Sequence, residues 1–117
     1  METKNAVTAL AALAQTSRLA VFRLLVQAGP EGFAASKIAE QLEIPASSLS
    51  FHLKELSHAE LIVSRQDGRF IIYAANYDAM NELIGFLTDN CCAGNSCSST
   101  VLVGKKLKRP RKTAVKS

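Results

Sequence analysis

The sequence predicts a small α+β domain that is mainly helical and carries one β-hairpin. Two observations support this fold class. Apolar residues recur at helical spacing in several segments, and two runs rich in β-branched and aromatic residues flank an Asp-Gly pair. The chain has 117 residues and no run of eighteen apolar residues, so we expect one domain, no membrane span and a cytoplasmic location.

Two helices are expected at the start of the chain. Apolar residues at helical spacing between Val7 and Ala14 predict the first, and those between Leu19 and Val26 predict the second. Polar residues 15–17 supply capping groups between them. Gly29-Pro30 then ends the second helix, because glycine accepts a left-handed cap and proline cannot continue a helix.

A helix-turn-helix unit is expected next. Residues 35–42 predict a short amphipathic helix, and a longer helix starts at Pro45 and runs to about Ala59. Two helices joined by a short turn form a unit whose second helix enters the major groove of DNA. The apolar stripe of that second helix consists of Leu49, Leu53 and Leu56.

Polar side chains off this stripe are candidates for contact with DNA. Hydroxyl and imidazole groups donate or accept hydrogen bonds at base edges and phosphates, and a lysine neutralises a phosphate. His58 is expected to be structural instead. The predicted DNA-contacting residues of this helix are Ser47, Ser48, Ser50, His52 and Lys54.

A β-hairpin is predicted over residues 61–75, with its turn at Gln66-Asp67-Gly68. A hairpin beside a DNA-reading helix acts as a wing. Arg65 and Arg69 flank the predicted turn, where guanidinium groups reach phosphates or the minor groove. Both arginines are therefore predicted to contact DNA.

The last predicted helix covers Tyr77–Asn90. Its outer face and that of the first helix are too apolar to be covered by so small a core, so we expect these two helices to pair with a second copy. A two-fold dimer places two reading helices about 34 Å apart, which matches a near-palindromic site in duplex DNA. The predicted fold is thus a winged helix-turn-helix homodimer.

All three cysteines lie in one heptapeptide after the last predicted helix. A soft ion prefers thiolates, and trivalent arsenic takes three of them in a pyramid. Zinc usually takes four donors, and no fourth cysteine or histidine is nearby in the sequence. A disulfide from Cys97 to Cys91 or Cys92, acting as a redox switch, and cysteines without a role remain as alternatives. The predicted ion site is Cys91, Cys92 and Cys97.

The charge of the chain is unevenly distributed. Residues 1–104 carry seven Lys/Arg and ten Asp/Glu, a net charge of −3, whereas residues 105–117 carry seven Lys/Arg and no acid, a net charge of +7. The predicted organisation is a dimerising DNA-binding domain over 1–90, an ion-binding segment over 91–97 and a disordered basic tail over 98–117. The tail is either a solvated end or a sequence-independent phosphate contact.

Residues 8–90 resemble the ArsR/SmtB family of metal-responsive repressors. The resemblance is carried by LAALAQTSRLAVFRLLVQAGPEG, KIAEQLEIPASSLSFHLKELSHAELI and VSRQDGRFIIYAA. It implies a winged helix-turn-helix homodimer that binds operator DNA. Typical members have Ser, Gln and Arg where this chain has Pro45, Ala46 and Phe51.

Two ligand motifs of the family are absent from the sequence. Its zinc motif begins with Asp-x-His, but Asp78 is followed by Ala79 and Met80, and residues 33–37 lack its other cysteine motif. The C-terminal cysteines resemble the subgroup that senses arsenite. The resemblance implies a repressor of arsenic-resistance genes that leaves DNA when arsenite, or antimonite, binds.

An enzyme is not expected. The chain has no Cys-x-x-Cys beside a βαβ unit, no glycine-rich cofactor loop and no acid–base partner near the cysteines. The alternative to an arsenic-responsive repressor is a winged-helix regulator that responds to redox state or to another ligand, with cysteines that do not bind arsenic.

Overall fold

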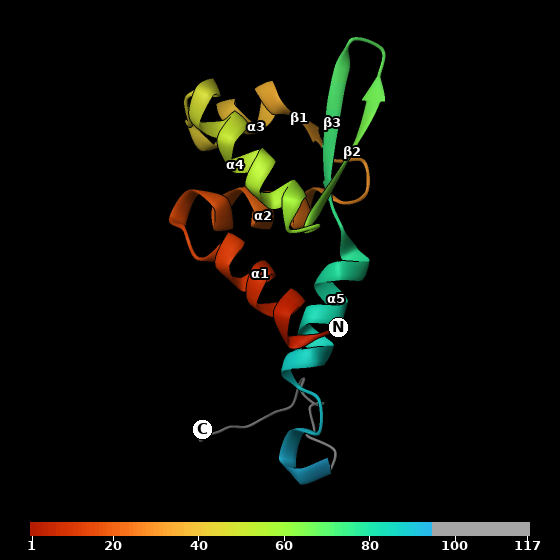
Figure 1. Ribbon diagram of the computed structural model, residues 1–117. Coiled ribbons are helices and arrows are strands. Elements are labelled where there is room, and N and C mark those ends of the chain that lie inside the picture. Colours follow the sequence, from red (N-terminus) through yellow and green to blue (C-terminus); the bar gives the residue numbers. More distant parts are fainter. Residues whose placement is uncertain (95–117) are drawn as a thin grey trace, which may run out of the picture. The chain divides into compact units, whose positions relative to one another are not determined.

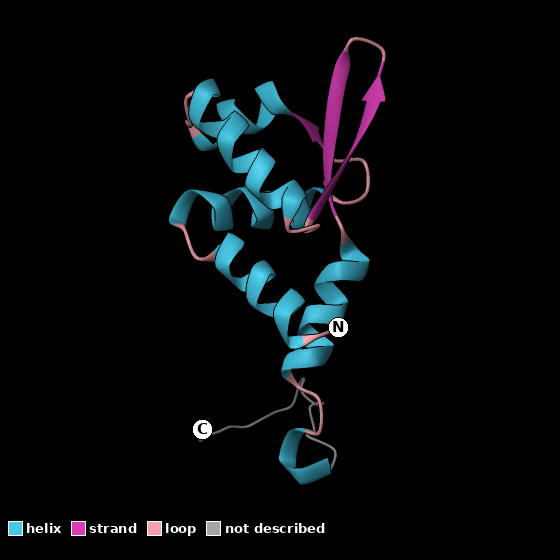
Figure 2. Cartoon of the chain, viewed as in Figure 1, coloured by secondary structure: helices cyan, strands magenta, loops and turns pink. Residues whose placement is uncertain are grey.

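The computed structural model describes residues 1–94 and divides the chain into two compact units, Met1–Phe86 and Leu87–Ser117 (Figures 1 and 2). The predicted α+β class is confirmed. In the first unit the hairpin projects at the same end as the helix-turn-helix, while α5 leads away from the opposite end (Figure 1). The elements are α1 (Thr3–Leu13), α2 (Thr16–Ala28), β1 (Phe33–Ala34), α3 (Ala35–Leu42), α4 (Ala46–His58), β2 (Ile62–Asp67), β3 (Phe70–Ala75), α5 (Tyr77–Leu87) and the short 3-10 helix η1 (Cys91–Gly94).

The helix-turn-helix unit consists of α3 and α4. The first helix has the predicted bounds, and Pro45 is the residue before α4 rather than its first residue. Glu43 ends α3 in the left-handed region (φ 55°, ψ 46°), and the Ile44 N–H donates to the Ala39 carbonyl at 3.1 Å. This six-to-one hydrogen bond is a Schellman motif, in which the left-handed position is usually glycine.

The sheet contains one strand that the sequence did not predict. Its order is β1-β3-β2, all antiparallel, with Phe33 opposite Tyr73 in the added pair. Gly32, just before β1, has a φ of 68°, and a Cβ there would lie 2.1 Å from the Tyr73 carbonyl oxygen. Glycine therefore permits both the backbone conformation and the close approach to β3.

The hairpin turn is one residue later than predicted. Asp67 is still paired with Phe70, so the two turn residues are Gly68 and Arg69. Gly68 has a φ of 64°, whereas the φ of Arg69 is not positive. Glycine at the first of two turn positions suits the right-handed twist of a hairpin.

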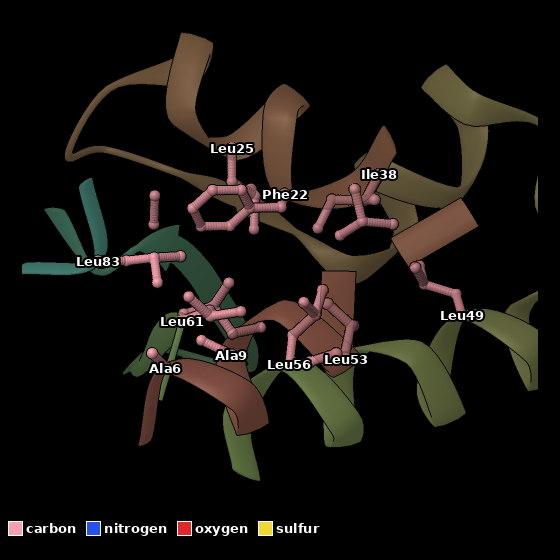
Figure 3. Packing of buried hydrophobic residues seen from close by; sticks show 14 residues of the cluster. Ala6, Ala9, Phe22, Leu25, Ile38, Leu49, Leu53, Leu56, Leu61 and Leu83 are labelled. Carbon is pink, nitrogen blue, oxygen red and sulfur yellow. The ribbon is translucent and has the colours of Figure 1, made fainter. Parts of the chain in front are cut away.

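The hydrophobic core joins all the helices of the first unit. Apolar side chains from α1, α2, α3, α4 and α5 point toward one another, with Leu61 at the start of the wing among them (Figure 3). Such close packing fixes the orientation of α4 relative to the hairpin. The largest fully buried side chains are Val21, Leu25, Ile38, Leu49, Leu56 and Leu61.

The start of α5 is anchored by side-chain hydrogen bonds. Asn76 Oδ1 accepts from the Ala79 N–H at 3.2 Å, as an N-cap does, and Asn76 Nδ2 donates to the Glu60 carbonyl at 2.9 Å. The Tyr77 hydroxyl donates to the Val26 carbonyl at 3.0 Å. The beginning of α5 is therefore tied both to the end of α4 and to the end of α2.

The last helix is shorter than predicted, because it ends at Leu87 rather than Asn90. Residues 88–90 form a turn, and Asn90 is left-handed with a φ of 58°. Threonine, aspartate and asparagine are weak helix formers, which explains the early end.

No single helix within residues 1–94 has the length and hydropathy to cross a membrane. The pair α1 and α2 meets the criteria of length and composition only together, with a bend of 102° between them.

Candidate nucleic-acid interface and cysteine segment

The outer face of α4 presents most of the predicted DNA-contacting side chains. Four of the five predicted positions on this helix are exposed. Their hydroxyl and ammonium groups are therefore accessible to base edges and phosphates. These residues are Ser47, Ser48, Ser50 and Lys54.

The prediction that His52 lies on this face is wrong. His52 is buried, with 9% of its surface exposed, and its Nδ1 atom has no hydrogen-bond partner among the described residues. It is three residues after Leu49 and four before Leu56, a spacing that places it on the core side of the helix. His58, which was expected to be structural, is exposed.

Phe51 is an exposed aromatic residue on the reading face. Of its surface 56% is accessible. It lies four residues after Ser47 and three before Lys54, so these three side chains share one side of α4. The same helical spacing, applied to every residue of α4, would have identified Phe51 from the sequence.

Arg18 of α2 supports this aromatic side chain. Its guanidinium carbon is 5.9 Å from the centroid of the Phe51 ring, and its Nη1 is 3.8 Å from Glu55 Oε1. The Arg18 N–H donates to Gln15 Oε1 at 2.9 Å, which fixes the first turn of α2. The beginning of α2 thus touches α4 beside its reading face.

The two wing arginines differ in their surroundings. Arg69 is exposed in the hairpin turn, next to a hollow that Ser36 at the start of α3 also lines. The Arg65 guanidinium instead donates to the Pro30 carbonyl at 3.3 Å and to the Glu31 carbonyl at 2.7 Å. Arg65 therefore holds the loop before β1 against the wing, a role that sequence reasoning did not foresee.

Apolar side chains remain exposed on the first and last helices. Val7 and Leu10 of α1 are 58% and 43% exposed, and Ile84 of α5 is 52% exposed. Ile84 also lines an open groove of the first unit, whose lining is mostly apolar and includes Leu19 and Val26. Exposed apolar side chains gathered on two helices are typical of a contact surface.

The cysteine segment belongs to the second unit. Cys91 is an exposed thiol, and its Sγ lies 3.4 Å from the Sγ of Cys92, which is disulfide-bonded in the structure. Cys92 is left-handed with a φ of 60°. Cys97, the third predicted ligand, and the predicted basic tail at 98–117 lie outside the described residues. Within residues 1–94, no three His, Cys, Asp or Glu side chains are grouped to hold a metal ion.

Known proteins resemble this chain in sequence and in fold. Residues 13–65 match the family described as a helix-turn-helix domain. The nodulation protein NolR of Rhizobium meliloti is 32% identical over 80 residues, which cover 68% of this chain and 63% of that protein. The chain therefore spans less than two thirds of the length of that relative.

Solved structures share the fold over most of the described chain. An ArsR-like transcriptional regulator from Rhodococcus sp. RHA1 is 25% identical, with a TM-score of 0.63, and the match covers 78% of this chain and 89% of that one. A homodimeric winged helix-turn-helix DNA-binding domain from Mycobacterium bovis, a possible ArsR-family regulator, is 21% identical with a TM-score of 0.61. That match covers 79% of this chain and 85% of the other.

Proposed function

We propose that this chain, which matches a helix-turn-helix domain over residues 13–65 and is similar to an ArsR-like transcriptional regulator, is a transcriptional repressor that trivalent arsenic releases from DNA. Arsenite, or antimonite, binds Cys91, Cys92 and Cys97 and thereby induces arsenic-resistance genes. The observation that carries this proposal is the position of three cysteines within seven residues, beginning four residues after the end of α5 in a winged helix-turn-helix fold.

DNA binding is supported by the exposed side chains of α4 and the wing. Ser47, Ser50 and Lys54 enter the major groove with α4, while Arg69 at the hairpin turn contacts the phosphate backbone or the minor groove. The first 104 residues carry a net charge of −3, so the basic residues of the tail add the sequence-independent attraction that this domain lacks. The repressor acts in the cytoplasm.

A homodimer is supported by the exposed apolar residues of α1 and α5. Val7, Leu10 and Ile84 would lose contact with water against the same helices of a second copy. Two-fold pairing presents two α4 helices to successive turns of the major groove, and the operator is accordingly near-palindromic.

Arsenic binding is supported by the chemistry and spacing of the cysteines. Cys91 and Cys92 are neighbours in the chain, their Sγ atoms lie 3.4 Å apart, and Cys97 follows five residues later. Three thiolates are the number that a pyramidal trivalent ion with a lone pair takes, whereas zinc usually takes four donors. Thiolates are the ligands, so the ion binds the reduced form of the segment.

The path from the cysteines to DNA runs along α5. The cysteine segment continues the chain after α5, and the other end of α5 is tied by Asn76 to the Glu60 carbonyl, just past the end of α4. An ion that gathers three thiolates orders residues 91–97 and shifts α5 in the dimer. The spacing of the two reading helices then no longer fits the operator.

A redox regulator is the second candidate function, and the disulfide state of Cys92 favours it. Here oxidation of two thiols, rather than ion binding, changes the affinity for DNA. Peroxide would then release the DNA, and arsenite would not.

The test is a footprint on the DNA upstream of the protein's own gene, with the full-length chain kept reduced by a phosphine. We expect protection without arsenite and its loss with arsenite. Single replacements Cys91→Ser, Cys92→Ser and Cys97→Ser should each keep DNA binding and abolish the arsenite response. Arsenite-induced release that survives all three replacements would refute the proposed site, and absence of any footprint would refute the repressor.

A further inference from the structure

The base-reading chemistry of α4 is unusually limited. In the major groove, Arg and Lys select guanine, Asn and Gln select adenine, Asp and Glu select cytosine, and apolar groups contact the methyl group of thymine. Between Ala46 and His58 the helix contains no Arg, Asn, Gln or Asp. Serine hydroxyls bond to several bases and discriminate little between them.

The one carboxylate of α4 is already engaged. Glu55 is half-buried and lies 3.8 Å from Arg18 Nη1. His58 is in the last turn of the helix and lines hollows together with residues of α1, whereas the first turns of a reading helix contact the bases. Apart from Ala46, which presents a single methyl group in the first turn, the exposed part of α4 has two base-selective side chains, Phe51 and Lys54.

The Phe51 ring is held in a defined position. The guanidinium of Arg18 lies 5.9 Å from its centroid, and the His52 ring lies 6.0 Å away with an interplanar angle of 62°. More than half of the side chain stays exposed in spite of these contacts. A fixed aromatic ring supplies contact area without losing much conformational entropy on binding.

We infer that Phe51 reads the C5-methyl group of a thymine in each half of the operator. The ring contacts that methyl group in the major groove while Ser47 and Lys54 bond to the same stretch of duplex. Phe51 is then a specificity-determining residue, and Arg18 is a positioning residue. This inference rests on the proposed DNA-binding function and adds the base that α4 selects.

The test uses the full-length chain and deoxyuridine, which differs from thymidine only by the C5-methyl group. Operator duplexes are first enriched from a random library, and each thymine of the enriched sequence is then replaced singly. We expect about fourfold weaker binding at one thymine of each half-site, the effect of one buried methyl group. Fluorescence anisotropy measures each affinity.

Variants test whether the preference for thymine over deoxyuridine comes from the Phe51 side chain. Phe51→Ala should bind thymine and deoxyuridine operators equally well at that position, and Phe51→Leu should retain part of the difference. Phe70→Ala, which removes another exposed aromatic ring outside α4, should retain all of it. Thermal unfolding checks that the variants are folded.

Two results would overturn the inference. One is an enriched operator whose thymines can all be replaced by deoxyuridine without loss of affinity, and the other is a thymine preference that Phe51→Ala leaves intact. Either result leaves the repressor proposal standing. If no sequence is enriched at all, the repressor proposal fails, and the inference fails with it.

Discussion

At the scale of single residues, local conformation and hydrogen bonding determine what each side chain contributes. Glu43 and Glu60 follow α3 and α4 with φ values of 55° and 62°, where the backbone of most residues is disfavoured by about 1–2 kcal/mol. Arg65 and Arg69 are four residues apart in the wing, yet only Arg65 donates to backbone carbonyls of another loop. These differences give two predictions.

Replacing Glu43 by glycine should stabilise the protein. Glycine adopts the left-handed conformation without the Cβ penalty, and its larger unfolded-state entropy offsets part of the gain, so we expect about 0.5–1 kcal/mol. Thermal or urea unfolding measures the change. Glu40→Gly, inside α3, is the control and should destabilise by about 1 kcal/mol. A Glu43→Gly variant less stable than the wild type would contradict the Schellman geometry.

The two wing arginines should separate stability from DNA affinity. Arg65→Ala removes two hydrogen bonds to the Pro30 and Glu31 carbonyls and should lower the free energy of unfolding by about 0.5–1.5 kcal/mol. Arg69→Ala should leave unfolding unchanged and reduce the salt dependence of DNA binding by about one phosphate contact per subunit. Unfolding and anisotropy titrations at several salt concentrations measure both. If both variants changed the free energy of unfolding equally, the assignment of Arg65 to stability and of Arg69 to DNA contact would be wrong.

At the scale of elements, the spacing of apolar residues predicted the helices and strands whose pattern is visible within one segment of the sequence. The bounds of α3 follow from its amphipathic pattern, and the hairpin follows from Asp67-Gly68 between two β-rich runs. The strand Phe33–Ala34 has only two residues, too few to show alternation, and it forms because β3 offers a free edge. The burial of His52 also has a local signal, because its spacing from Leu49 and Leu56 places it on the core side of α4. The contact of Arg65 with the loop before β1 has no such signal, because it depends on packing between distant segments.

The junction between α4 and α5 depends on Asn76. Asn76→Ala removes the N-cap of α5 and the hydrogen bond to the Glu60 carbonyl, so we expect a loss of about 1–2 kcal/mol in the free energy of unfolding. If α5 transmits the signal, the variant should also respond less to arsenite at the same cysteine occupancy. Unfolding and operator titrations with and without arsenite measure the two effects. Asn76→Asp keeps the cap acceptor but loses the hydrogen bond to the Glu60 carbonyl, so it separates the two contributions. Full stability of Asn76→Ala would exclude a capping role.

At the scale of the whole molecule, the account requires two copies. Ile84→Glu places a charge on the exposed apolar side of α5 and should convert a dimer into a monomer that binds the operator at least tenfold more weakly. Val63→Glu, an equally exposed position in β2, should leave the dimer intact. Sedimentation equilibrium distinguishes the two states. A wild-type chain that is monomeric at micromolar concentration would contradict the predicted pairing of α1 and α5.

The coupling between the cysteines and DNA is tested most directly by linkage. Arsenite affinity is measured for the reduced full-length protein, free and saturated with operator duplex, and DNA affinity is measured with and without saturating arsenite. Since coupling between two sites is reciprocal, each ligand must weaken the other by the same factor, which we expect to be about 5–150. An arsenite affinity that operator DNA leaves unchanged would contradict the account.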